Sequence, residues 1–115
     1  MTVMNMVQAI NSALASEMEA DDSVIILGED VGRAGGVFRV TDGLFERFGG
    51  DRVIDTPLAE SLIAGMATGM AMAGLRPVAE MQFMGFSYLA LSMIISHTAR
   101  MRNRSRGSYT VPIVM

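Results

Sequence analysis

Several residue types that carry common protein chemistry are missing from this 115-residue sequence. Cysteine and tryptophan are absent, and His97 is the only histidine. Without cysteine the chain can form no disulfide, thiolate metal site, iron–sulfur cluster or cysteine nucleophile. All nine basic residues are arginine, so the lysine that a Schiff base requires is missing as well. With a single histidine, zinc chemistry and a serine–histidine–aspartate triad are poorly supported.

Charged residues are few and unevenly distributed. Twelve acidic and nine basic residues give a formal net charge of −3, and half of all residues are hydrophobic. This balance is typical of a folded domain and argues against a disordered tail. Residues 1–60 carry eleven acids and four arginines, whereas residues 61–115 carry one acid, Glu80, and five arginines. We expect no nucleic-acid partner, because the chain has no general excess of positive charge.

The amino-terminal residues indicate where the protein resides. They lack the basic and apolar regions of a secretory signal, and Glu17 and Glu19 do not suit a transit peptide, which predicts a cytoplasmic protein. Residues 81–99 contain no charged residue and are followed by four arginines, so on length alone they form a marginal membrane span. Serines, Gln82 and His97 inside that stretch favour a buried helix of a soluble protein, and we expect no membrane span.

Short apolar runs alternate with helical patterns along the chain. The patterns predict strands at residues 24–27, 52–55, 77–81 and 109–115, and helices at residues 4–20, 41–48, 60–73 and 85–102. Thr41 and Asp42 should cap the second helix, and Gly74 should end the third. Continuous β-branched runs are typical of strands buried on both faces. The predicted fold class is therefore α/β, a parallel sheet with helices on both faces.

The last predicted strand reaches the end of the sequence at Met115 without a polar tail. A parallel sheet that ended there would leave an apolar edge uncovered. We therefore expect residues 1–115 to be the front part of a longer protein.

Ligands of open α/β sheets bind beyond the carboxyl ends of the strands, so the segments that follow the strands are the candidate sites. Residues 28–32 could approach a phosphate through their glycines, but they lack the spacing of known phosphate loops. Glu29 and Asp30 would also repel an anion, which favours a solvated surface or subunit-contact turn. The arginine-rich residues 100–107 are either the solvated end of a helix or a patch for anions or subunit salt bridges.

Glu60 begins the long helix predicted at residues 60–73, and its role has two interpretations. It could simply oppose the positive end of the helix dipole. It also lies between two apolar runs, with no arginine nearer in sequence than Arg52, which suits a desolvated carboxyl poised for proton transfer. In the same helix Gly65 and Gly69 lie one turn apart, which predicts close approach of another backbone, within the domain or across an interface.

Aromatic residues gather after the third predicted strand. Phe83, Phe86 and Tyr88 offer flat apolar faces, and Gln82 offers an amide that both donates and accepts hydrogen bonds. This set suits a heteroaromatic ring, and core packing is the alternative.

Taken in order, these segments strongly resemble the beta subunit of the thiamine diphosphate-dependent first component of 2-oxo acid dehydrogenase complexes, of the pyruvate, branched-chain and acetoin types. The resemblance spans nearly the whole chain. The matching stretches are residues 4–11 (MNMVQAIN), 27–32 (LGEDVG), 35–39 (GGVFR), 52–60 (RVIDTPLAE), 74–77 (GLRP), 82–83 (QF) and 104–107 (RSRG).

The resemblance implies a thiamine diphosphate-binding fold, in which residues 1–115 are the N-terminal part of the pyrimidine-binding domain and the C-terminal transketolase-like domain is absent. It places Glu60 as the catalytic and cofactor-binding glutamate that hydrogen-bonds N1′ of the aminopyrimidine. Leu58 and Gln82 would lie beside the cofactor, and Phe86 would stack on the pyrimidine. No metal-ligating residue is assigned, because the alpha subunit would supply the Mg²⁺ and diphosphate site.

The implied activity is decarboxylation of a 2-oxo acid, pyruvate or a branched-chain one, with transfer of the acyl group to the lipoyl group of the acyltransferase component. The implied assembly is an α2β2 heterotetramer, and the chain alone should be inactive. Alternatives are a truncated, structural subunit fragment, an acetoin dehydrogenase beta subunit, and a nucleotide-binding module, which the missing phosphate loop disfavours. The sequence departs from the family at residues 89–93, and His97 is expected to serve helix packing or an interface.

Overall fold

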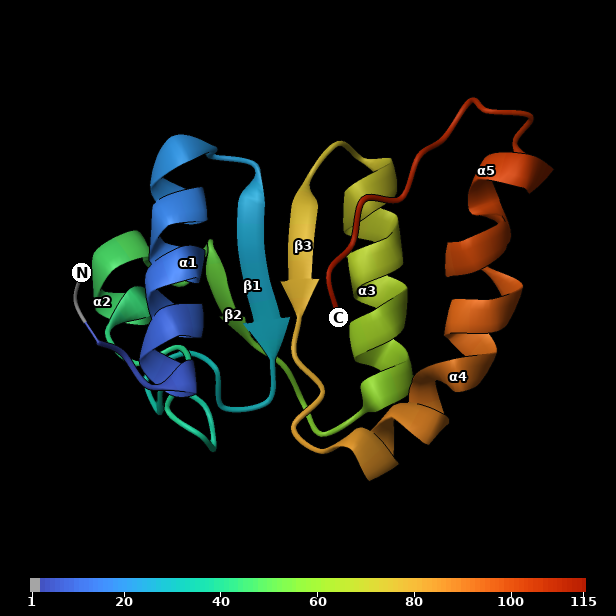
Figure 1. The fold of residues 1–115 in the computed structure, drawn as a ribbon. Helices are drawn as coiled ribbons and strands as arrows, with labels where there is room; N and C mark the ends of the chain where they lie inside the picture. The colour runs from blue at the N-terminus through green and yellow to red at the C-terminus, as the bar shows by residue number, and fades with distance from the viewer. Residues whose placement is uncertain (1–2) are drawn as a thin grey trace.

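A parallel three-stranded sheet with strand order β2-β1-β3 forms the centre of the computed structural model, which describes residues 3–115 (Figure 1). The strands are β1 (Val24–Gly28), β2 (Val53–Asp55) and β3 (Arg76–Ala79). The helices are α1 (Met6–Ala20), α2 (Leu44–Phe48), α3 (Glu60–Met72), α4 (Ser87–Ser96) and α5 (Met101–Arg104), with short 3₁₀ turns η1 (Met84–Phe86) and η2 (Thr98–Arg100). The α/β fold class predicted from the sequence is confirmed.

The central strand β1 is buried along all five of its residues. It pairs in parallel with β2, where Ile26 lies opposite Val53, and with β3, where Leu27 lies opposite Ala79. A strand that is paired on both sides and covered on both faces must be apolar throughout, which explains the run from Val24 to Leu27.

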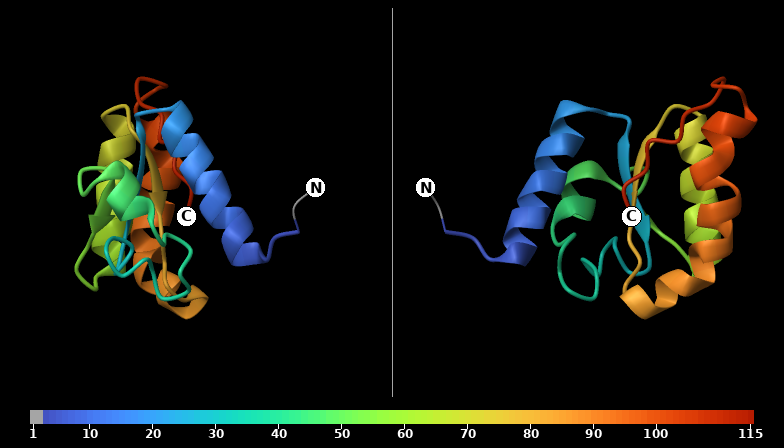
Figure 2. Two further views of the ribbon diagram at one scale, coloured as in Figure 1. Left: turned by 90° about the vertical axis from the view of Figure 1, so that its left-hand side faces the viewer. Right: turned by 45° about the vertical axis from the view of Figure 1, so that its right-hand side comes forward.

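Helices cover both faces of the sheet, as Figures 1 and 2 show. On one face α1 and α2 pack against alternate residues of β1, and this core centres on Met18, Ile26 and Val53. On the other face α3 packs against Leu27 and Ala79 through Ile63 and Ala67. Small residues on α3 therefore let the helix lie close to the sheet.

The first helix begins with a reciprocal cap. The side chain of Asn5 accepts a hydrogen bond of 2.9 Å from the backbone N–H of Gln8, whose side chain accepts one of 3.1 Å from the N–H of Asn5. Such a capping box satisfies two donors that a helix start leaves free. The helix predicted from residue 4 therefore begins at Met6.

The predicted cap of α2 by Thr41 and Asp42 is wrong. Gly43 is the N-cap, with φ of 76° and no side-chain cap. The Thr41 hydroxyl instead donates a 2.6 Å hydrogen bond to the carbonyl of Val31, and Asp42 pairs with Arg39. Both side chains therefore hold the loop between β1 and α2 rather than the helix.

The single helix predicted over residues 85–102 is also wrong. The segment divides into η1, α4, η2 and α5, and the break falls at His97, with φ of −118° and ψ of −67°. Arg104 donates a hydrogen bond of 2.9 Å to the carbonyl of Ser96, the last residue of α4. A long-range contact thus satisfies a carbonyl that a continuous helix would have used internally.

The fourth predicted strand, residues 109–115, shortens to a single parallel bridge between Val78 and Val114. Val114 donates to the carbonyl of Pro77 at 3.1 Å and accepts from the N–H of Ala79 at 2.8 Å. Pro112 has no N–H to donate, so the ladder cannot extend through it.

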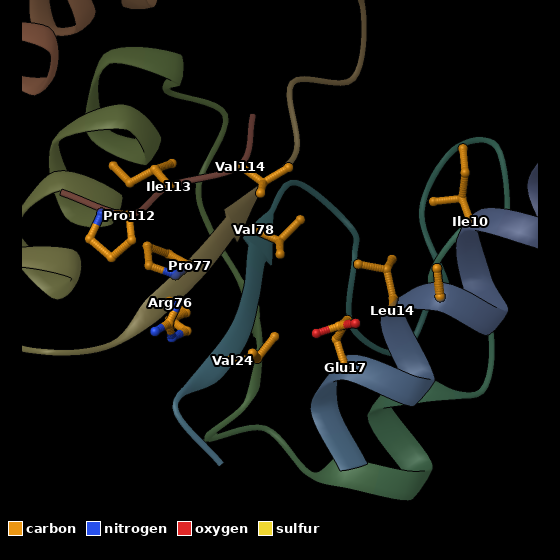
Figure 3. Close-up of a pocket in the computed structure, with 11 residues that line it drawn as sticks. Ile10, Leu14, Glu17, Val24, Arg76, Pro77, Val78, Pro112, Ile113 and Val114 are labelled. Carbon is orange, nitrogen blue, oxygen red and sulfur yellow. The ribbon is translucent and has the colours of Figure 1, made fainter. Parts of the chain in front are cut away.

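An apolar groove separates α1 from this last segment (Figure 3). Its volume is about 460 Å³, and Leu14 on α1 faces it from one side while Val78 and Val114 line it from the other.

Within residues 3–115, no helix combines the length and the apolar character that crossing a bilayer requires.

Candidate functional site

A polar side chain follows each strand of the sheet at its carboxyl end. Glu29 follows β1, Thr56 follows β2 and Glu80 follows β3. Backbone hydrogen bonds continue the pairing into these segments: the N–H of Thr56 donates to Gly28 and that of Glu80 to Leu27, both at 2.9 Å. The three segments therefore leave the sheet side by side, at the edge where ligands of α/β folds bind.

Glu60 is the first residue of α3 and is only 4% exposed. The preceding N-cap, Ala59, provides no side-chain hydrogen bond to the helix start. None of the ion pairs within residues 3–115 involves Glu60. The sequence-based expectation of a desolvated carboxyl at the start of α3 is therefore confirmed.

The expectation that Glu29 lies in a solvated turn is wrong. Its side chain is buried, with 6% exposure, and its Oε1 atom has no hydrogen-bond partner within residues 3–115. Burial raises the pKa of the Glu29 carboxyl, and the nearby charges of Glu60 and Asp30 raise it further. Within the loop between β1 and α2, which carries Glu29, the Thr41 hydroxyl donates a hydrogen bond to the carbonyl of Val31.

Glu80 lies at the end of β3, the strand that pairs with β1 on the side opposite β2. Its Oε2 atom is buried and has no hydrogen-bond partner within the described residues. Burial raises the pKa of Glu80, and the charge of Glu29 adds to the effect. Gly36 of the loop lies next to this carboxyl, since a Cβ there would be in van der Waals contact with Oε1 at 3.5 Å.

Three phenylalanine rings form an aromatic cluster beside this edge. Phe83 makes edge-to-face contacts with Phe38 and Phe86, each with ring centroids 5.5 Å apart. Phe83 and Phe86 are each 45% exposed, so the rings are not simply core residues. The cluster thus presents apolar faces to a flat ligand, and Phe38, on the distant loop, joins residues that the sequence predicted.

The four residues predicted to bind a cofactor occupy the same end of the sheet. Leu58 precedes α3 by one residue and is 78% exposed, whereas Glu60 two positions later is buried. The amide of Gln82 donates a 3.4 Å hydrogen bond to the carbonyl of Glu29, and Phe86 closes η1. This end of the sheet therefore carries one buried carboxyl, one bound amide and two exposed apolar side chains.

Sequence reasoning missed Glu29 and Glu80 as members of this site. Each follows immediately after a short strand, Glu29 after β1 and Glu80 after β3. An acid at that position of adjoining strands was the signal that could have identified them.

Other candidates lie away from the sheet end. A Cβ at Gly65 would meet only the end of Met93, at 3.4 Å, and one at Gly69 would meet nothing within 4 Å, so within residues 3–115 neither glycine faces another backbone.

His97 is exposed, which contradicts packing within the domain. The arginine-rich segment is mainly exposed, and Arg104 binds the helix end at Ser96, as expected for a helix terminus.

Metal-binding groups do not gather at the sheet end. Among residues 3–115, no three histidine or acidic side chains are placed so that they could hold a metal ion together. Glu29 and Glu80 therefore need another explanation.

A half-open sheet end with a buried carboxyl and aromatic faces defines a cofactor-binding domain of the α/β class. The chain matches the family described as transketolase, pyrimidine binding domain, over residues 2–115, and it belongs to that family.

The chain is also similar to several curated beta subunits of dehydrogenases. The chain is 52% identical to the pyruvate dehydrogenase E1 component subunit beta of Acholeplasma laidlawii and 56% identical to the 2-oxoisovalerate dehydrogenase subunit beta of Bacillus subtilis, in both cases over all 115 residues. It is 54% identical over 112 residues to the 3-methyl-2-oxobutanoate dehydrogenase subunit beta of Mycobacterium tuberculosis. The matched region is 97–100% of this chain and 32–35% of those relatives, so the chain spans about a third of their length.

Proposed function

We propose that residues 1–115 form the N-terminal part of the pyrimidine-binding domain of a 2-oxo acid dehydrogenase beta subunit that binds thiamine diphosphate. The observation that carries this proposal is the buried carboxyl of Glu60 at the start of α3, at the sheet end that also bears the half-exposed rings of Phe83 and Phe86. Membership of the pyrimidine-binding family and similarity to beta subunits of pyruvate and 2-oxoisovalerate dehydrogenases support it.

The residues at the sheet end fit the aminopyrimidine ring of the cofactor. A ring nitrogen needs a polar partner that is shielded from water, and Glu60 offers a carboxyl that is 4% exposed. The ring faces need apolar cover, which Leu58 and Phe86 can supply. Gln82 is already held by the carbonyl of Glu29, so its amide is fixed in place before any ligand arrives.

When bound, thiamine diphosphate supplies the electron sink that decarboxylation of a 2-oxo acid requires. The chain's own contribution is a proton at the Glu60 carboxyl, held or released at the ring nitrogen N1′. Burial makes this exchange effective, because a carboxyl shielded from water interacts strongly with its partner. Phe86 and Leu58 orient the ring and exclude water from it.

The substrate is either pyruvate or a branched-chain 2-oxo acid, and the acceptor of the acyl group is a lipoyl group of an acyltransferase component. Mg²⁺ and the diphosphate are assigned to an alpha subunit within an α2β2 assembly.

A chimeric enzyme tests the proposal. Residues 1–115 are joined to the remaining two thirds of the Bacillus subtilis 2-oxoisovalerate dehydrogenase subunit beta and purified with the alpha subunit of that enzyme; we refer to this as the assembled chimera. Calorimetric titration with thiamine diphosphate and Mg²⁺ should show binding only when both subunits are present. Decarboxylation of pyruvate and of 2-oxoisovalerate by the same preparation then compares the two substrates. Assembly without cofactor binding would contradict the proposal.

A further inference from the structure

Glu29 and Glu80 stand at the carboxyl ends of two neighbouring strands. β1 and β3 are paired with Leu27 opposite Ala79, and the N–H of Glu80 donates to the carbonyl of Leu27 at 2.9 Å. A Cβ placed at Gly28 would lie only 3.0 Å from the Cβ of Glu80. The segments that carry the two acids therefore leave the sheet in contact with each other.

Each acid has a buried oxygen atom without a hydrogen-bond partner in the described part of the chain. These atoms are Oε1 of Glu29 and Oε2 of Glu80, and the Glu29 side chain is 94% buried. Burying an ionised carboxyl without partners is costly, and a buried acid lowers that cost by taking up a proton.

The charges that act on the two acids are themselves acidic. Glu60 on α3 and Asp30 in the adjoining loop act on Glu29, and Glu29 acts on Glu80. The ion pairs within residues 3–115 join Arg39, Arg47, Arg52 and Arg76 to other acids. No arginine of the described region is among the charges that act on Glu29 or Glu80.

We propose that Glu29 and Glu80 together retain one proton at neutral pH and act as a positioning pair that limits the negative charge beside Glu60. Two coupled acids release their protons as a unit, so the proton belongs to the pair rather than to either residue. With it, the pair carries one negative charge instead of two. The catalytic consequence rests on the proposed function, whereas the protonation itself does not.

Infrared spectroscopy of the cofactor-free assembled chimera tests the protonation. The carbonyl stretch of a protonated carboxyl is separate from that of a carboxylate, so the wild type should show this band at pH 7 and lose it as the pH is raised further. Glu29→Gln and Glu80→Gln should each lower the pH at which the band disappears, and the double variant should lack it. Glu46→Gln, at an exposed position on α2, is the matched control and should change nothing.

Absence of the band from the wild type at pH 7 would overturn the proposal, and so would a band that persists in the double variant. The wild-type protein alone shows whether the band is present at pH 7, so the test still works if a variant does not fold.

The pH profile of decarboxylation tests the positioning role. Glutamine mimics a neutral carboxyl, so Glu29→Gln should flatten the decline of kcat at alkaline pH. A purely structural role would instead lower kcat at every pH without changing the profile. Glu60→Gln separates the two proposals: if it stays fully active, the proposed function fails while the infrared result still decides whether the pair holds a proton.

Discussion

The carboxylate of Asp55 accepts a hydrogen bond of 2.6 Å from the backbone N–H of Gly32, so the end of β2 holds the loop that follows β1. A Cβ at Gly32 would lie 2.8 Å from Cγ of Asp55, closer than real atoms approach. A side chain at residue 32 would therefore displace the Asp55 carboxylate and break this bond. The bond fixes the loop that covers Glu29 and brings Phe38 to the aromatic cluster.

Replacing this acceptor should loosen the loop. Asp55→Ala is expected to lower the free energy of unfolding by about 1–2 kcal/mol, because the N–H of Gly32 loses a charged partner. Urea denaturation of the 115-residue chain measures the change. Asp51→Ala, at a nearby exposed aspartate, is the control and should have little effect. Equal loss in both variants would contradict a specific role for the Asp55–Gly32 bond.

Glu60→Gln in the assembled chimera should leave assembly intact and reduce decarboxylation by about 10²- to 10⁴-fold, the usual cost of losing a positioned acid or base. Steady-state kinetics measures the loss, and size-exclusion chromatography checks assembly. Glu46→Gln on the exposed face of α2 should retain full activity. Near-wild-type turnover by Glu60→Gln would remove Glu60 from the chemistry.

The raised pKa values of Glu29 and Glu80 predict how stability changes with pH. The folded state binds their protons more readily than the unfolded chain, so their contribution is complete below the ordinary pKa of 4.5. It is lost as the pH rises through the folded pKa values. The double variant Glu29→Gln/Glu80→Gln should therefore melt at a higher temperature than wild type at pH 8, and the gain should disappear near pH 4. A gain that is independent of pH would refute this linkage.

The pKa of Asp21 shifts in the opposite direction. The hydroxyl and the N–H of Ser23 donate to its Oδ1 at 2.6 and 2.8 Å and lower its pKa below the ordinary value of 3.8. Its contribution to stability is present above pH 3.8 and is lost as the pH falls through the folded pKa. Ser23→Ala should therefore destabilise the chain at pH 7 but not at strongly acidic pH, as thermal melts would show. Ser108→Ala, which loses no side-chain bond in the described region, is the control.

Mg²⁺ should not bind tightly to the 115-residue chain. Mg²⁺ prefers carboxylates together with phosphate oxygens and water, and no three acidic or histidine side chains within residues 3–115 are placed to hold it. Calorimetric titration with MgCl₂ and thiamine diphosphate should give no stoichiometric signal. Saturable, Mg²⁺-dependent binding to the chain alone would show that the assignment of this site to an alpha subunit is wrong.

Local patterns explain which parts of the fold could be predicted. The apolar run of β1 and the spacing of α1 are local signals, and both elements lie where the sequence placed them. The break at His97 depends on Arg104 reaching back to Ser96, and the shortened last strand depends on where β3 lies. Hydrophobic periodicity reports neither the contact of Arg104 with Ser96 nor the effect of Pro112, which has no N–H to extend the ladder.

The candidate site divides in the same way. Glu60 could be predicted to be desolvated, because it lies between two apolar runs of the sequence. Glu29 is buried in a loop within which Thr41 binds Val31, and Phe38 of the same loop contacts Phe83. A sequence pattern contains no sign of such contacts.

The central position of β1 also has a consequence for synthesis on the ribosome. Ile26 pairs with Val53, which is synthesised 27 residues later. Val24 pairs with Arg76, which is synthesised 52 residues later. At about 5–20 residues per second, the apolar strand stays without its second neighbour for roughly 3–10 s after it is made. During that interval α1 and α2 can already cover one face of β1, while the edge reserved for β3 stays open to chaperones or to another nascent chain.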